Sequence, residues 1–465
     1  MKHTIFIKEA IMLKKSSTNM LSGSIFKGLL SMAIPIMIMN VAQTLFNVMD
    51  MTALKWFSDD KAVGAVGACG MLITLFTSLL IGISAGANVV VAKRLGAGNK
   101  SLADKAVSTA ILLSLVGGFI LMAVGVVFAE KFLMMTNCPD SLLKDATLYF
   151  KIYFYGIPIA MLYNFCAAIL RATGDTRRPM YYLLIGGAIK VIFTVIFVSQ
   201  FNMTVEGVAF ATIIANSVSC ALAFRTLTKS NNIISLNLRN LRFSGRELKE
   251  ILFIGIPTGL QSSLYSLANV VITTAVNGFG PDATTGIAIA NQFDGILYQI
   301  SYAPSLAVIP YVAQNIGAKN IKRVKQVVWK AIIITALFGG IFGAFSAIFS
   351  KQLSSIMSST PAVIDYSRQK MIIISSTYFI CGINEVMCGT LRGMGKPIIP
   401  TISTLVYMCI LRFIWVYLIF PLFPNLTFLY LVWPIGWILS IITLFIVYIP
   451  AISKLKRQLD EEKAV

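Results

Sequence analysis

The chain has 465 residues, of which 57% are hydrophobic and only 12% are charged, and its mean hydropathy is +0.80. Water-soluble domains carry about 25% charged residues, so this composition excludes a water-soluble enzyme. The few charges nevertheless sum to +20, from 39 Lys and Arg against 19 Asp and Glu. In a membrane protein such an excess first indicates which loops face the cytoplasm.

Apolar segments recur along the whole chain, and each is long enough to cross about 30 Å of hydrocarbon as a helix. The segments are continuous and rich in Gly and Ala, which favours packed helices over the alternating strands of a membrane barrel. We therefore predict an all-α integral membrane protein with twelve transmembrane helices. The predicted spans are 31–54, 64–92, 105–129, 146–170, 179–200, 205–226, 250–276, 285–312, 330–350, 370–391, 398–420 and 428–450.

The cations are unequally divided between the two sets of loops. When cations near the span ends are counted with the adjoining loop, the N-terminal segment, the even-to-odd loops and the C-terminal tail hold 29 Lys and Arg. The opposite loops then hold eight, and two remain within spans. The positive-inside rule then predicts that both termini are cytoplasmic, in a bacterial-type inner membrane. Clusters such as Arg239, Arg242, Arg246 and Lys249 are suited to contacts with anionic membrane lipids. No soluble domain is left for nucleic-acid binding.

Cysteine and histidine usage gives no sign of a metal or disulfide framework. His3 is the single histidine, and all seven cysteines except Cys138 fall within predicted spans. We therefore expect no metal site and no cofactor.

The chain also repeats itself at an offset of 221–222 residues. Ala33-Ile34-Pro35 matches Gly255-Ile256-Pro257, and Asn47-Val48 matches Asn269-Val270. Six spans separate the copies, so the repeat predicts two parallel six-helix lobes related by a pseudo-twofold axis along the membrane normal. Chance similarity between two Gly-rich apolar halves is the alternative. The predicted boundaries are a cytoplasmic N-terminal segment at 1–30, an N-lobe at 31–226, a cytoplasmic linker at 227–249, a C-lobe at 250–452 and a cytoplasmic tail at 453–465.

Several motifs together resemble the multidrug and toxic-compound extrusion (MATE) family over nearly the full length of the chain. They are Pro35 followed by Asp50, Gly86-Ala87-Asn88, the run Leu170–Pro179, which is similar to the family's LRGxGDTRxP loop, and its second copy Leu391–Gly395. The resemblance implies a secondary antiporter that exports organic, often cationic, drugs in exchange for H⁺ or Na⁺ by alternating access, as a monomer. The stretch after Asp50 departs from the family's DTxxVGRLG-like run.

Ionisable groups inside hydrocarbon are costly and are functional candidates by default. We select five as candidates, with a net charge of −1: Asp50, Lys190, Asp294, Glu385 and Arg412. The resemblance implies that Asp50 is the acid used for cation coupling. A carboxyl group suits this role because burial disfavours its charged form, so a proton can be bound in one access state and released in the other. The alternative is an aspartate at a water-exposed helix end.

Lys190 is the most informative departure from the family. Members carry an NxxxD-like pair in span 5, whose aligned positions here are Lys190 and Thr194, while Thr212 in span 6 matches a family threonine. We hypothesise that the Lys190 ammonium occupies the cation position beside Asp50. Proton exchange then rests on this pair, or coupling moves to the second lobe. A lysine that faces a watery cavity is the alternative.

In the second lobe, Arg412 is equivalent to Lys190, and Asp294 and Glu385 supply acids. Either both acids are functional, or they form a purely structural ion pair. Pro35 and Pro257 are candidate hinges in spans 1 and 7. Six amide side chains are the candidates for a substrate cavity between the lobes, although amides also bridge helices. They are Asn40, Gln43, Asn47, Asn164, Gln261 and Asn269.

Other functions were weighed against drug export. A flippase for a lipid-linked precursor needs central cations for a pyrophosphate, which Lys190 and Arg412 could supply. An enzyme is not expected, because the elbow-like Gly82–Gly86 lies in an apolar helix and no Walker A sequence is present. A sensor that does not transport is a further alternative.

Overall fold

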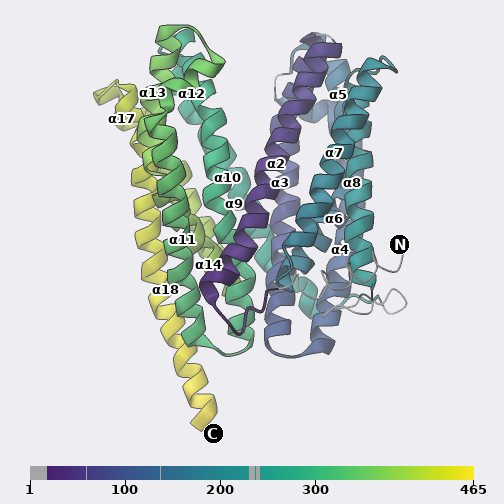
Figure 1. Cartoon of the computed structure of the whole chain (residues 1–465), viewed down its shortest axis with the longest axis vertical. Coiled ribbons are helices and arrows are strands. Elements are labelled where there is room, and N and C mark those ends of the chain that lie inside the picture. Colours follow the sequence, from purple (N-terminus) through teal and green to yellow (C-terminus); the bar gives the residue numbers. More distant parts are fainter. Residues whose placement is uncertain (1–17, 59, 137, 230–235, 237–240, 465) are drawn as a thin grey trace, which may run out of the picture. The chain divides into compact units, whose positions relative to one another are not determined.

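The computed structural model describes residues 18–58, 60–136, 138–229, 236 and 241–464. Within these ranges the chain is almost entirely helical and contains no strand (Figure 1). His3, most of the predicted N-terminal segment and the linker residue Arg239 lie outside the described residues.

The helices are α2 (Ile25–Phe57), α3 (Asp60–Gly96), α4 (Lys100–Met135), α5 (Asp140–Tyr155), α6 (Ile157–Ala172), α7 (Arg177–Ser199), α8 (Val205–Thr228), α9 (Gly245–Asn277), α10 (Pro281–Gly317), α11 (Ile321–Ile348), α12 (Ser350–Met357), α13 (Pro361–Ser376), α14 (Tyr378–Gly393), α15 (Ile398–Thr404), α16 (Leu411–Ile414), α17 (Leu426–Tyr430) and α18 (Val432–Ala464). Two π-helical segments, η2 (Leu405–Ile410) and η3 (Trp415–Ile419), and a 3-10 turn, η4 (Phe420–Leu422), complete the described elements.

The predicted multi-pass membrane architecture is confirmed. In the described part of the chain, nine helices are long and apolar enough to cross a membrane, and two bent helix pairs raise the number to 11. The remaining predicted span, 250–276, lies within α9, which is one unbroken helix of 33 residues but is not among those 11. Its Ser, Thr, Asn and Gln side chains lower its hydropathy.

Two spans that the sequence predicts as continuous are bent. The pairs α5–α6 and α13–α14 each change direction by 47°. The breaks fall at Gly156 and Thr377, which are separated by the same offset as the sequence repeat. At each break the backbone N–H donates three residues back, from Gly156 to Tyr153 and from Thr377 to Ile374, both at 3.0 Å. This tightened last turn ends the first helix of each pair.

The eleventh predicted span, 398–420, is also irregular. It begins as α15 and continues through η2, the short α16 and η3, so Arg412 lies between two π-helical segments. Such π-helical segments are rare and occur frequently at functional sites. The apolar sequence of this span gives no sign of the change, because its residues suit an ordinary helix.

The chain divides into two compact units. The first unit holds Met1–Asn19 and Ile38–Ile256, and the second unit holds Met20–Met37 and Pro257–Val465. The division therefore passes through α2 just after Pro35 and through α9 at Pro257.

In the first unit, the start of α9 packs directly on α3. A Cβ atom added at Gly86 would lie 2.2 Å from the carbonyl oxygen of Ile251, and one added at Gly255 would lie 2.6 Å from the Cα of Ile83. The two backbones therefore touch, as small residues permit in membrane helices. Arg94 strengthens the contact through an ion pair of 3.1 Å with the buried Glu247.

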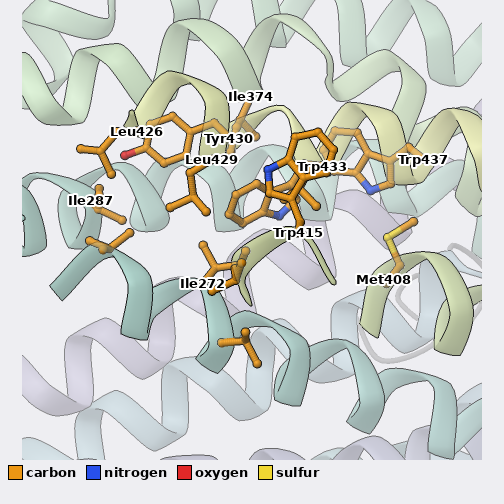
Figure 2. Packing of buried hydrophobic residues seen from close by; sticks show 14 of the residues in the cluster. Ile272, Ile287, Ile374, Met408, Trp415, Leu426, Leu429, Tyr430, Trp433 and Trp437 are labelled. Atoms are coloured by element: carbon orange, nitrogen blue, oxygen red, sulfur yellow. The ribbon is translucent and has the colours of Figure 1, made fainter. Parts of the chain in front are cut away.

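In the second unit, an aromatic core joins α9, α10, α13, η2, η3, α17 and α18 (Figure 2). Trp415, Trp433 and Trp437 lie at its centre, together with the fully buried Tyr430. The ring centroids of Tyr430 and Trp433 are 6.3 Å apart, and both residues are labelled in Figure 2. Large rings fixed on several sides give this part of the unit little freedom to rearrange, and the same Trp433 also contacts the charged groups described below.

Gly86→Ala should lower the thermal unfolding temperature of the purified protein. The added methyl group meets a backbone oxygen that cannot rotate away, so the expected cost is about 1–3 kcal/mol. Gly67→Ala, on the same helix with nothing within 4 Å of its added Cβ, is the matched control. The control should be neutral or slightly stabilising, because Ala favours helix over Gly. Equal unfolding temperatures for the two variants would contradict the close α3–α9 contact.

Candidate functional sites in the two units

The first unit holds a buried ion pair between α2 and α7. Lys190 Nζ lies 2.5 Å from Asp50 Oδ2, and the two side chains are 13% and 9% exposed. Thr194 Oγ1 donates a hydrogen bond of 3.3 Å to Asp50 Oδ1. Lys190 and Thr194 are four residues apart on one helix, so both can reach the same carboxylate. The three predicted residues are therefore brought together.

This contact depends on a glycine one turn away. A Cβ atom added at Gly187 would lie 1.8 Å from a ring carbon of Phe46. Phe46 precedes Asp50 by one turn of α2, and Gly187 precedes Lys190 by about one turn of α7. The missing side chain lets α2 approach closely enough for the ion pair to form. Thr212, the fourth predicted residue, instead donates to the Val208 carbonyl of its own helix at 2.9 Å.

The second unit holds another buried ion pair, whose basic member the sequence analysis missed. Lys370 Nζ lies 2.8 Å from Asp294 Oδ2 and also donates to Asn291 Oδ1. The Tyr378 hydroxyl donates to the Asp294 backbone carbonyl at 3.0 Å. Lys370 is the first residue of the predicted span 370–391, next to the outer loop, but it is only 3% exposed. The polar residues around Lys370 in the sequence gave no sign that its side chain is buried beside Asp294.

Arg412 has no acidic partner among the contacts of the described residues. Its Nη1 donates a hydrogen bond of 2.6 Å to Asn269 Oδ1, and its Nη2 is buried without a hydrogen-bond partner. The guanidinium lies 5.2 Å from the ring centroid of Tyr265 and 5.0 Å from that of Trp433. The aromatic rings stabilise the cation through cation–π attraction. Arg412 therefore occupies the position in the second unit that Lys190 occupies in the first, as predicted, but its partner is an amide instead of a carboxylate.

Glu385 belongs to a polar network at the base of the same unit. Glu385 is 8% exposed, and Arg392, seven residues further along the same helix α14, is 3% exposed. Arg392 Nη2 donates to Gln261 Oε1 at 2.8 Å, and Gln261 Nε2 donates to Thr404 Oγ1 at 2.8 Å. Gln261, a predicted cavity residue, thus bridges three helical segments.

The remaining predicted amides are more dispersed. Asn40 is half-buried on α2, while Gln43 and Asn47 on the same helix are exposed. Asn164 is half-buried and donates to the Ala160 carbonyl of its own helix at 2.9 Å. Among the six, only Gln261 and Asn269 accept hydrogen bonds from an arginine in the described structure.

The structure adds two buried bases to the five predicted groups. Lys370 and Arg392 are both 3% exposed and belong to the bent α13–α14 span. Added to the five predicted groups, they give three acids and four bases, a net charge of +1 instead of −1. Asp50 and Asp294 each have a lysine partner, whereas Glu385, Arg392 and Arg412 form no ion pair among the described residues. Among the described residues, no cluster of three or more His, Cys, Asp or Glu could hold a metal ion.

Comparison with known proteins identifies the family. The MatE family model matches the chain twice, over residues 35–196 and 257–418. The chain belongs to the MatE family. The two matches begin 222 residues apart, which confirms both the predicted internal repeat and the predicted resemblance.

Curated relatives of this MatE-family chain are similar over most of their length. It is 25% identical over 390 residues to a probable multidrug resistance protein, YoeA, of Bacillus subtilis, covering 82% of this chain and 84% of that protein. It is 27% identical over 386 residues to the probable multidrug resistance protein NorM of Thermotoga maritima, covering 82% of each. A FAD transporter of Shewanella oneidensis is 22% identical over 401 residues, covering 85% of this chain and 88% of that protein.

Solved structures share the fold. A multidrug resistance MATE family transporter in an outward-facing conformation matches with a TM-score of 0.87 at 20% identity, over 94% of this chain and 98% of that one. A transporter from Pyrococcus furiosus, described as having a binding pocket of reversed polarity, matches with the same TM-score, identity and coverage. The all-helical, two-lobe repeat architecture predicted for this MatE-family chain is thereby confirmed.

Lys370→Met should destabilise the protein because it leaves the buried Asp294 carboxylate without its cation. Breaking a buried pair in this way typically costs about 3–5 kcal/mol. The double variant Lys370→Met with Asp294→Asn should regain most of the loss, because the charge that lost its partner is gone. Thermal unfolding of the three purified proteins tests this. A double variant as unstable as the single variant would show that the pair contributes little.

Proposed function

We propose that this MatE-family protein exports organic compounds, many of them cationic drugs, in exchange for an inward-moving cation by alternating access. Family membership and relatives named as multidrug resistance proteins support export. The observation that carries the coupling mechanism is the buried Asp50–Lys190 pair of the first unit. No ATP-binding sequence is present, so an ion gradient supplies the energy.

We propose H⁺ as the ion that couples at Asp50. The Lys190 ammonium already occupies the side of the carboxylate where Na⁺ would bind, and Thr194 contacts the other oxygen. Protonation of Asp50 removes its negative charge and therefore its Coulomb attraction to Lys190. The pair then separates, and deprotonation toward the other side of the membrane allows it to form again.

The Asp294–Lys370 pair is the corresponding candidate in the second unit. Asp294 Oδ1 is buried without a hydrogen-bond partner among the described residues, so a proton could be accommodated there. Tyr378 holds the backbone at this residue, which keeps the carboxylate beside Lys370. We propose that this pair acts as a second proton-exchange centre.

We also propose Pro35 and Pro257 as hinges for the access change. Proline removes one hydrogen bond from the helix ladder and so lowers the cost of bending. The boundary between the two compact units falls within α2 and within α9, next to these prolines.

The remaining features of the proposal concern location and partners. From the distribution of its cations between the loops, we infer that the protein lies in the cytoplasmic membrane with both termini inside. It works as a monomer without a cofactor, contacts anionic lipids through its basic loops and binds no nucleic acid. The flippase alternative is weaker, because the ion pair with Asp50 neutralises Lys190, one of the two cations on which that alternative rests.

Asp50→Asn should reduce efflux driven by a pH gradient by about tenfold or more, because an amide cannot bind and release the coupling proton. Ethidium efflux from proteoliposomes with an imposed pH gradient is the measurement. Asp282→Asn, which changes an exposed acid of the second unit, is the control and should behave like the wild type. Equal efflux by the wild type and Asp50→Asn would show that Asp50 takes no part in proton coupling.

Lys190→Asn should create a dependence on sodium. An amide oxygen is a hard ligand that can share Na⁺ with Asp50, whereas the ammonium of the wild type excludes it. Efflux should therefore rise with an imposed sodium gradient in the variant and remain insensitive to it in the wild type. Lys351→Asn, at an exposed position of α12, serves as the control. The hypothesis fails if sodium dependence is the same in variant and wild type.

A further inference from the structure

One indole ring in the second unit contacts two buried cations. Lys370 Nζ lies 5.8 Å from the ring centroid of Trp433, and the Arg412 guanidinium lies 5.0 Å from the same centroid. Both distances are within the range of about 6 Å over which an aromatic ring attracts a cation. The two cations are therefore at most about 11 Å apart, and buried charges at such a separation are screened only weakly by salt.

The surrounding core fixes the places of this ring and of the arginine. Trp433 lies in the first turn of α18, and its ring is packed beside that of Tyr430 in the aromatic core (Figure 2). The Arg412 guanidinium is held further by the Tyr265 ring at 5.2 Å and by the hydrogen bond of 2.6 Å to Asn269 Oδ1. Closely packed side chains of this kind keep one arrangement. The distance between the two cations is thus a property of the folded unit.

The two cations differ in their counter-charges. Lys370 Nζ lies 2.8 Å from Asp294 Oδ2, whereas Arg412 forms no ion pair among the described residues. Glu385 and Arg392, the buried acid and base of α14, carry charges that cancel in sum. The group of Asp294, Lys370 and Arg412 therefore has a net charge of +1 when the aspartate is ionised and +2 when it has bound a proton. Proton binding at Asp294 thus concentrates positive charge inside the unit.

The other titratable side chains of the core around this group are neutral near pH 7. Tyrosine and cysteine lose their protons only at higher pH, so they add no charge. These residues are Tyr378 and Cys381 on α14, Tyr265 on α9, Tyr298 on α10, Tyr366 on α13, Tyr407 on η2 and Tyr430 on α17. Arg412 is therefore the fixed charge that acts on proton exchange at Asp294.

We propose that Arg412 and Trp433 are positioning residues for proton exchange at Asp294. The guanidinium supplies a positive charge that opposes the charge gained when Asp294 binds a proton, and it so promotes release of that proton. The Trp433 ring holds the guanidinium and the Lys370 ammonium at a constant distance from each other. This inference rests on the proposed exchange role of the Asp294–Lys370 pair, and it adds the groups that determine the pH at which the pair exchanges.

Infrared difference spectroscopy of the purified full chain, recorded as a function of pH, measures this effect directly. The carbonyl stretching band of a protonated carboxyl group is assigned to Asp294 if it is missing in Asp294→Asn. The pH at which this band reaches half of its intensity should rise by about one unit in Arg412→Gln. This shift is a roughly tenfold change in proton affinity, as expected for a charge about 10 Å away at an effective dielectric constant of about 20. Trp433→Leu should shift the midpoint in the same direction by a smaller amount, and Trp433→Phe, which keeps an aromatic ring, should lie closer to the wild type.

Asn269→Asp tests the same idea with Arg412 still in place. Its carboxylate takes the position of the amide oxygen that accepts the hydrogen bond from Arg412, so the guanidinium gains a counter-charge. The midpoint of the Asp294 band should therefore rise as it does in Arg412→Gln, even if that variant fails to fold. Arg368→Gln is the matched control, because it removes an exposed arginine of α13 whose charge is screened by water. Its midpoint should equal that of the wild type.

An unchanged midpoint in either Arg412→Gln or Asn269→Asp, in protein that unfolds near the wild-type temperature, would overturn the proposal. It would also fail if Asp294→Asn removed no titrating band, since Asp294 would then bind no proton. A wild-type midpoint in Trp433→Leu would refute the role of the indole ring.

Efflux driven by a pH gradient tests the exchange role separately. If Asp294→Asn reduced efflux while Arg412→Gln left the infrared midpoint unchanged, the role of Arg412 would be refuted and the exchange role kept. If the midpoint shifted as expected while Asp294→Asn transported like the wild type, the exchange role would be refuted and the effect of Arg412 on Asp294 kept.

Discussion

Charged side chains in a protein of this apolar composition are stable only where a partner compensates for lost water. The Asp50–Lys190 pair illustrates this constraint most directly, with both groups buried and 2.5 Å apart. The same requirement explains why Lys370 reaches Asp294 and why Arg392 is hydrogen-bonded to Gln261. Much of the helix packing in each unit can be understood as the means of bringing these partners together.

Small residues make that approach possible. The missing side chain of Gly187 leaves room for the Phe46 ring, so that α2 and α7 can approach each other. Gly86 and Gly255 in the same way allow the backbones of α3 and α9 to touch. Hydrocarbon provides no hydrophobic drive for helix association, so close packing and polar contacts must supply it. A pair formed in this way is also sensitive to protonation, because its attraction vanishes when the acid is neutralised. The features that hold each unit together are therefore the ones suited to an ion-coupled change of conformation.

The two units are copies of one repeat, but their buried charged side chains have different partners. In the first unit, the cation on the fifth span meets an aspartate from the first span. In the second unit, Arg412 at the equivalent position meets Asn269 and two aromatic rings, and the acid Asp294 pairs with a lysine on another helix. This arginine forms no ion pair among the described residues. Duplication followed by divergence has thus given the cation on the fifth span a different type of partner in each lobe.

The amino-acid sequence by itself determined the membrane class, the internal repeat, the family and the Asp50–Lys190–Thr194 group. The first two depend on local hydropathy and on a constant offset, and spacing within one helix puts Lys190 and Thr194 on the same face. Their association with Asp50, on another helix, was implied by the resemblance to the family. Only the tertiary structure decided the partners in the second unit, where Lys370 stood at the end of a predicted span next to a loop and Arg412 was expected beside an acid. The bends at Gly156 and Thr377 were likewise invisible in the apolar pattern. Which helices face one another depends on contacts between distant segments, and no local pattern records these contacts.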